Sequence, residues 1–102
     1  MIHVKREDFT IEVKGHAGQA EAGKDIVCAA ASILIYSLAE ELQSHVDRMH
    51  ELDIDLQSGD ATVSAFPKDD FEGICADIFN TVWCGFRHLS YQYPDYIHVE
   101  WL

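Results

Sequence analysis

A cysteine and a histidine that could do chemistry lie close together near the start of the chain. The sequence predicts a helix that begins near Asp25, and Cys28 is the third residue after that position. Backbone N–H groups are unpaired in the first turn of a helix, and the helix dipole favours negative charge there. We therefore expect the Cys28 thiolate to be stabilised and to act as a nucleophile. The alternative is a small buried residue among alanines, which is the usual fate of a free cysteine.

His16 lies in a glycine-bearing segment that joins the first predicted hairpin to this helix. A short segment of this kind can fold back, so that the imidazole reaches the sulfur and takes its proton. The amides at the helix start could then hold the oxyanion of a tetrahedral intermediate. A lone histidine in a loop is otherwise a solvated surface residue, and spacing alone leaves both interpretations open.

Asp25 and Ser32 are candidates for supporting roles. Asp25 either orients the imidazole or caps the helix, and we expect capping, because an unpaired carboxylate beside the sulfur would oppose thiolate formation. Ser32 is one helical turn beyond Cys28 and either donates a hydrogen bond into the site or bonds to the backbone four residues earlier.

The remaining cysteines and histidines do not form a second site. Cys75 lies on the apolar stripe of a predicted helix and is assigned to the core, whereas Cys84 is expected to be exposed or at a dimer contact. His45 and His50 are five residues apart and do not align two ligands on one helix face. Three cysteines without finger spacing also argue against a disulfide framework and a structural zinc site. We expect no metal and no cofactor.

Composition limits the classes of protein and partner. The 102 residues fit one domain, residues 1–102, and 48% hydrophobic residues suffice for one modest core. With 18 acidic and 7 basic residues the formal net charge is −11, which would repel a phosphate backbone and attract basic peptides. We therefore expect no direct contact with nucleic acid.

The first residues lack the apolar run of a signal peptide, and the longest mostly apolar run, 26–39, is short for a bilayer. These features predict a cytoplasmic protein without a membrane segment.

Hydrophobic periodicity predicts an α+β fold. Alternating residues indicate hairpins at 2–13 and 52–66 and a closing strand at 96–101. Residues at helical spacing indicate one helix from Asp25 to Met49 and a second from Asp69 to Leu89. The second helix is expected to begin with a capping box formed by Asp69 and Glu72. The predicted order is ββαββαβ, with both helices packed on one face of a mostly antiparallel five-stranded sheet. The first turns of the first helix have almost no polar face, so that either a second protomer or a neighbouring loop is expected to cover them.

The segment GHAGQAEAGKDIVCAAAS, Gly15 to Ser32, resembles the bacterial ribosomal-processing cysteine proteases called Prp. The motif GHAG is followed after six residues by Asp25, after two more by Cys28 and after three more by Ser32. This order and spacing match the family pattern. Outside this segment the similarity is looser but extends over the whole chain, including the closing YPDYI stretch.

The resemblance implies an α+β homodimer in which His16 and Cys28 form a catalytic dyad and a glycine-rich loop moves to admit substrate. Gly15, Asp25 and Ser32 fall on further motif positions, and the substrate loop would contain Ala17, Gly18, Gln19 and Gly23. Such proteases remove a short amino-terminal extension from a ribosomal large-subunit protein, cleaving after aromatic residues, and some phage structural proteins carry similar sites. The implied substrate is an extended basic segment.

Two departures from the family pattern concern specificity. Gln19 stands where the family often has an aromatic residue, and Ala31 where valine is common, so a ribosomal substrate and a phage substrate stay open. Two other functions also stay open: a non-catalytic protein that binds a basic ribosomal or capsid peptide, and another thiol enzyme, such as an acyltransferase.

Overall fold

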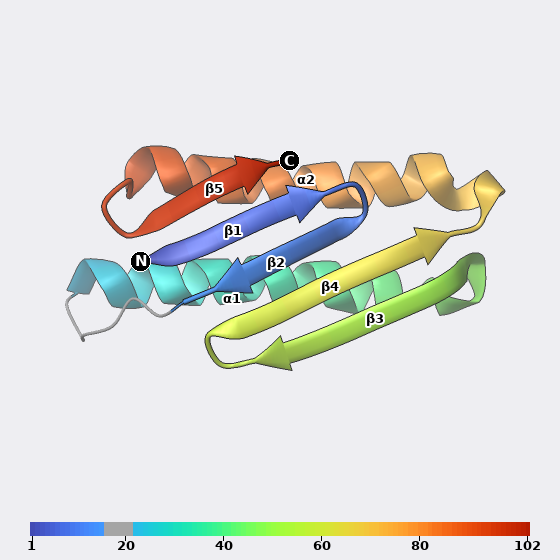
Figure 1. The fold of residues 1–102 in the computed structure, drawn as a ribbon, viewed down its shortest axis with the longest axis horizontal. Coiled ribbons are helices and arrows are strands. Elements are labelled where there is room, and N and C mark those ends of the chain that lie inside the picture. The colour runs from blue at the N-terminus through green and yellow to red at the C-terminus, as the bar shows by residue number, and fades with distance from the viewer. Residues whose placement is uncertain (16–21) are drawn as a thin grey trace.

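The protein consists of two layers, a five-stranded sheet and a pair of helices that cover one of its faces (Figure 1). The computed structural model describes residues 1–15 and 22–102, without the side chains of 22–25. The elements in chain order are β1 (Ile2–Glu7), β2 (Thr10–Lys14), α1 (Ala22–Gln43), the 3-10 turn η1 (Val46–Arg48), β3 (Met49–Gln57), β4 (Asp60–Pro67), the 3-10 turn η2 (Asp69–Phe71), α2 (Glu72–Gln92) and β5 (Ile97–Trp101). The predicted α+β class and element order are confirmed.

The sheet order is β3-β4-β2-β1-β5, so the second hairpin lies beside the first through β4 and β2. All neighbouring strands are antiparallel except β1 and β5, which run parallel. The register pairs Lys14 at the end of β2 with Asp60 at the start of β4. This pairing brings the turn between β3 and β4 next to the point where β2 leads towards α1.

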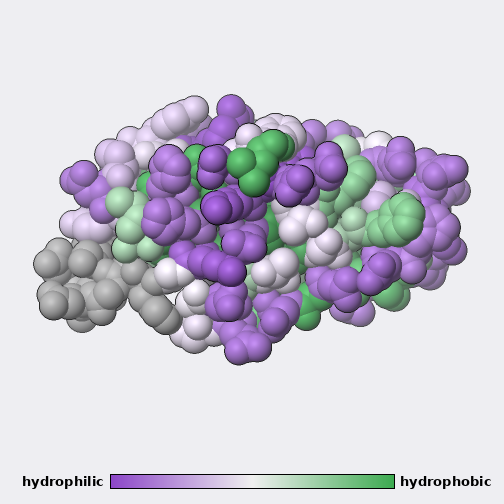
Figure 2. Space-filling model, viewed as in Figure 1, coloured by the Kyte–Doolittle hydropathy of each residue, from purple (hydrophilic) through white to green (hydrophobic). Residues whose placement is uncertain are grey.

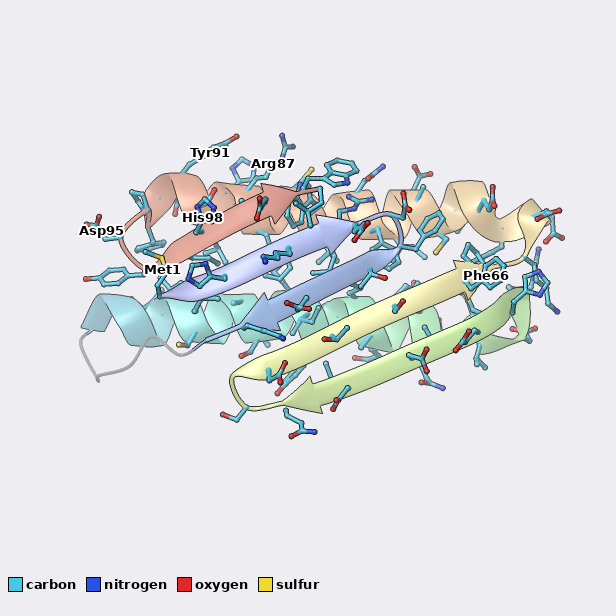
Figure 3. All side chains as sticks on the ribbon, viewed as in Figure 1. Met1, Phe66, Arg87, Tyr91, Asp95 and His98 are labelled. Carbon is cyan, nitrogen blue, oxygen red and sulfur yellow. The ribbon has the colours of Figure 1, made fainter. Side chains whose placement is uncertain are left out.

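Alternation along the strands separates a buried face from an open one. Ile2, Val4 and Arg6 of β1 are buried beneath the helices, while the residues between them are exposed. The open face is predominantly hydrophilic, as Figure 2 shows, and His98 and Phe66 lie at separate ends of it in Figure 3. The core is formed by the stripes of both helices against the sheet, and Phe71, Phe79 and Phe86 are among its largest fully buried side chains.

Helix ends differ from the predictions in three places. The first helix begins at Ala22 rather than near Asp25, and it ends at Gln43 rather than Met49. The end is explained by Ser44, whose hydroxyl donates to the carbonyl oxygen of Glu41 at 2.6 Å and competes with a further helical turn. The capping box at Asp69 and Glu72 is also wrong, because α2 follows a 3-10 turn and has no side-chain cap hydrogen bond.

Helix α1 is long and apolar enough, by length and composition alone, to cross a membrane. Its segment Ile26–Gln43 spans 18 residues with a mean hydropathy of 1.4. The expectation that the longest apolar run is too short was therefore wrong for this helix. A core helix meets the same criterion, and 33% of the segment is buried within the protein.

Candidate active site

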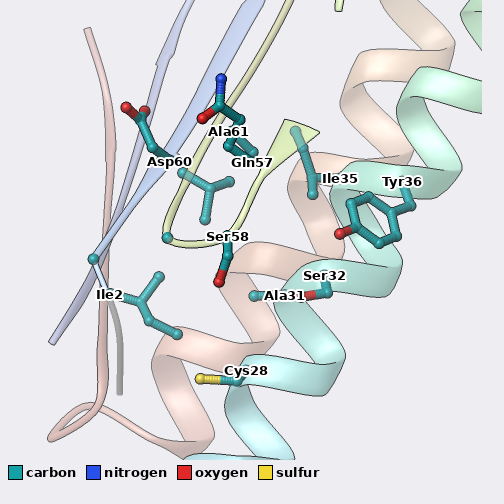
Figure 4. Close-up of a pocket in the computed structure, with 13 residues that line it drawn as sticks. Ile2, Cys28, Ala31, Ser32, Ile35, Tyr36, Gln57, Ser58, Asp60 and Ala61 are labelled. Atoms are coloured by element: carbon teal, nitrogen blue, oxygen red, sulfur yellow. The ribbon is translucent and has the colours of Figure 1, made fainter. Parts of the chain in front are cut away.

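Cys28 opens into a cavity of about 200 Å³ at the amino-terminal end of α1 (Figure 4). The cavity lies between the start of β1, the end of β2, one face of α1 and the β3–β4 turn. Cys28, Ala31, Ser32 and Ile35 share that helix face, because they are three, four and seven residues apart. The Cys28 side chain is half-buried and points into the cavity, a position that a substrate can reach.

The cavity has an apolar floor and a polar rim. Ile2, Val13 and Ile35 contribute the floor, whereas the rim carries the hydroxyl groups of Ser58 and Tyr36. An apolar floor beneath polar groups suits a substrate whose side chain is buried and whose backbone is hydrogen-bonded.

Gly15 connects β2 to the segment that carries His16, and its backbone geometry requires glycine. Its φ is +101°, and a Cβ atom at this position would collide with the carbonyl oxygen of Met1. The Gly15 N–H donates to the carbonyl oxygen of Gly59 at 3.0 Å. The start of the histidine-bearing segment is therefore fixed to the β3–β4 turn on the wall of the cavity.

The observed helix start changes the expected surroundings of the sulfur. Cys28 is the seventh residue of α1 when Ala22 is the first, so its N–H lies beyond the unpaired amides of the first turn. Helix-dipole effects fall off within that turn. The prediction that amides of the helix start surround the sulfur is therefore not supported.

The structure brings three of the predicted site residues together, since Gly15, Cys28 and Ser32 all line the cavity. His16, Ala17, Gly18 and Gln19 lie outside the described residues.

Gly23 and Asp25, expected in the loop and at its end, lie instead in the first turn of α1, so Asp25 is not the N-cap. Ser32 makes no hydrogen bond to the rest of the described chain, and its expected intrahelical bond is absent.

The other two cysteines differ from Cys28 as predicted. Cys75 is fully buried, and burial raises the pKa of its thiol to about 11. Cys84 is exposed and accepts a hydrogen bond from Arg87 Nη2 at 3.5 Å. Neither of them lines the cavity beside α1.

Among the side chains that the structure describes, no three His, Cys, Asp or Glu form a group that could hold a metal ion. His45 and His50 instead contact Phe71 and Phe66, each with ring centroids 4.9 Å apart.

The β3–β4 turn is the part of the cavity that sequence reasoning missed. The residues Ser58-Gly59-Asp60 predicted a hairpin turn, but their proximity to Cys28 depends on the pairing of β2 with β4. That pairing joins strands separated by the whole of α1, and short-range periodicity carries no information about it.

An α+β fold with an accessible cysteine in a cavity at one helix end is an arrangement that a thiol enzyme can use. A family model described as cysteine protease Prp matches residues 1–98. The chain belongs to this family of cysteine proteases, which confirms the predicted family and enzyme class. No curated protein matches the sequence.

Solved structures of the same fold extend over the whole chain. The essential ribosomal processing protease Prp from S. aureus in complex with a substrate peptide has a TM-score of 0.82 and 20% identity, with 100% of both chains covered. The same protease with a covalently linked product peptide has a TM-score of 0.78 and 21% identity, again with 100% of both chains covered. SMU.848 from Streptococcus mutans has a TM-score of 0.72 and 24% identity, covering 99% of this chain and 91% of its own.

Proposed function

We propose that this protein is a cysteine endopeptidase that removes a short amino-terminal extension from a ribosomal large-subunit protein or a similar phage structural protein, with Cys28 as nucleophile and His16 as base. The observation that carries the proposal is the cavity beside the accessible Cys28 sulfur in a chain of the Prp family. The similarity to an S. aureus ribosomal processing protease in complex with a substrate peptide supports the type of substrate.

In the proposed reaction, His16 takes the proton from the Cys28 thiol, and the sulfur attacks the carbonyl carbon of the cleaved bond. The protonated imidazole then gives its proton to the leaving amine, and water releases the acyl group from the sulfur. Because Cys28 lies beyond the first helical turn, the imidazole carries the larger share of thiolate stabilisation. Removal of His16 is therefore expected to be as damaging as removal of the sulfur.

The cavity floor supports a substrate with an aromatic or large apolar residue before the cleaved bond. Ile2, Val13 and Ile35 contribute apolar surface to the cavity that Cys28 lines, and burial of one large side chain there contributes about 1.5–3 kcal/mol. The net charge of −11 favours a substrate whose flanking residues are basic.

We also propose that the protein is a cytoplasmic homodimer whose contact surface includes the outer face of α1. Ile26 and Ile33 are 55% and 65% exposed on this face, and the alanines between them add no polar cover. A second protomer would remove this apolar surface from water.

Cleavage of a basic peptide with Phe-Phe before Ala, followed by mass spectrometry, tests the proposal. We expect one cut after the second phenylalanine, and a loss of at least a thousandfold in kcat/KM for both Cys28→Ser and His16→Ala. Cys84→Ser is the matched control, because it removes an exposed thiol outside the cavity, and it should cleave normally.

Proteolysis by Cys28→Ser would contradict the assignment of the nucleophile. Binding of the peptide without cleavage by the unmodified protein would instead indicate a peptide-binding role. Comparison of kcat/KM for a ribosomal and a phage cleavage sequence separates the two proposed kinds of substrate.

A further inference from the structure

A second cavity, of about 450 Å³, lies apart from the Cys28 cavity. It forms where the β1–β2 turn, the end of β4, the first turns of α2 and the end of β5 meet, and it shares no lining residue with the Cys28 cavity. Phe66, on its border, is seen in Figure 3 at the end of the sheet remote from the amino terminus of α1. Its volume lies within the range of about 300–1,000 Å³ that is typical of small-molecule sites.

A buried arginine reaches this cavity. Arg6 is 3% exposed and is the buried charged side chain of the described core. Its guanidinium carbon lies 4.0 Å from the ring centroid of Trp101 and 5.8 Å from that of Phe79. Burial lowers the pKa of this guanidinium, against a smaller opposing effect of Cys84. The group nevertheless stays a cation at neutral pH, because arginine is effectively always protonated in proteins.

The hydrogen-bonding capacity of Arg6 is only partly used. Its Nε donates to the backbone oxygen of Asp8 at 3.4 Å, but its Nη1 is buried without a hydrogen-bond partner. Within the described residues no carboxylate lies within 4.0 Å of the guanidinium. A buried, unpaired charge is costly, so an external carboxylate that bonds to Nη1 would gain a charge-assisted hydrogen bond.

The remaining walls select what can accompany that carboxylate. The aromatic rings of Phe9, Phe66 and Trp101 provide apolar surface, and the last two are among the most exposed large apolar side chains of the protein. Asp8 and Glu72 also line the cavity. Their carboxylates would repel a simple anion, whereas an ammonium group on the same ligand would be attracted to them.

We propose that this cavity binds a free amino acid with a large apolar side chain, such as phenylalanine. Its carboxylate pairs with Arg6, its ammonium group faces Asp8 and Glu72, and its side chain packs against the aromatic rings. Because the Trp101 indole lies over the guanidinium, it turns aside to admit the carboxylate. Trp101 is 57% exposed near the end of an edge strand, and the movement gives up its contacts with Arg6 and with the Trp83 ring, whose centroid is 6.1 Å away.

Titration with L-phenylalanine, followed by tryptophan fluorescence, tests this proposal directly. The chain has two tryptophans, of which Trp83 is buried and Trp101 lines the cavity, so a saturable signal is expected from Trp101. Isothermal titration calorimetry gives a readout that does not depend on the indole. We expect 3-phenylpropionate, which lacks the ammonium group, and 2-phenylethylamine, which lacks the carboxylate, each to bind at least tenfold more weakly.

Two variants with matched controls locate the site. Arg6→Met should weaken binding at least tenfold, whereas Lys5→Met, which removes an exposed cation from the other face of β1, should leave it unchanged. Glu72→Gln changes an exposed carboxylate, so the fold should be retained, and it should weaken binding severalfold, unlike Glu51→Gln on β3. Any of three results would overturn the proposal: equal binding of the three ligands, unchanged binding by Glu72→Gln, or no saturable binding of L-phenylalanine. In that case water alone would bond to Arg6 Nη1.

Discussion

The three thiols of the chain lie in three different environments. Cys28 is half-buried at the wall of a cavity, Cys75 is fully buried in the core, and Cys84 is exposed on α2 beside Arg87. The sequence distinguished two of these cases from the helical stripe of α2, because Cys75 falls on its apolar side and Cys84 does not. It could not define the cavity beside Cys28, whose opposite wall comes from a distant turn.

Removal of the buried thiol by Cys75→Ala should change how stability depends on pH. Burial raises the pKa of Cys75 from 9.0 to about 11, so between these values the unfolded thiol loses its proton while the folded one keeps it. The contribution of this thiol to the free energy of unfolding is therefore complete below pH 9 and is lost as the pH rises from 9 to 11. The contribution is about 2–3 kcal/mol, and it should be absent from the variant.

Urea unfolding at pH 8 and pH 11 measures this difference. The variant is expected to be less stable than the original protein at pH 8, because it leaves a small cavity, so the quantity to compare is the loss between the two pH values. An equal loss in both proteins would contradict the assignment to Cys75.

Gly15→Ala should damage both stability and cleavage. The substitution places a side chain at a φ of +101° and against the carbonyl oxygen of Met1, and such strain costs about 1–3 kcal/mol. Because the Gly15 N–H is bonded to Gly59, relief of the strain would displace the segment that carries His16. We expect a lower Tm and a decrease of at least tenfold in kcat/KM, while Lys14→Ala, an exposed neighbour, changes neither strongly.

Local periodicity predicted which elements form, but not how they are ordered in the sheet. Alternation identified the strands and helical spacing identified both helices, since each signal arises from residues within one element. The placement of β4 between β3 and β2, by contrast, depends on pairing between strands that α1 separates in the chain. The start of α1 was misplaced by three residues because Asp25 is a good capping residue in isolation, yet the helix continues through it.

The two helices approach each other closely at Gly85, and this contact predicts an effect of Gly85→Ala. A Cβ atom there would overlap the Leu34 side chain of α1, whereas a Cβ atom at Gly73, near the start of the same helix, meets nothing within 4 Å. We expect Gly85→Ala to lower stability by about 1–3 kcal/mol and Gly73→Ala to raise it by up to about 1 kcal/mol. Chemical denaturation of both variants measures the difference, and similar values would mean that Leu34 moves aside freely.

As an assembly, the protein is proposed to bury the outer face of α1 against a second copy. Ile33→Glu places a charge in the middle of this face and should convert a dimer into a monomer, as measured by sedimentation equilibrium. Ile74→Glu is the control, because Ile74 is similarly exposed but lies on α2. A monomeric original protein, or an Ile33→Glu protein that stays dimeric, would show that this face is not the contact surface.

Strand β1 borders both cavities of the molecule, Ile2 at one end and Arg6 at the other. Both side chains project to the helix-covered face because they are four positions apart, an even offset in a strand whose side chains alternate between two faces. Deletion of one residue between them would reverse this parity, and either Ile2 or Arg6 would then project into solvent unless the strand bulged. The spacing within five consecutive residues therefore links the integrity of the two cavities, although no side chain lines both.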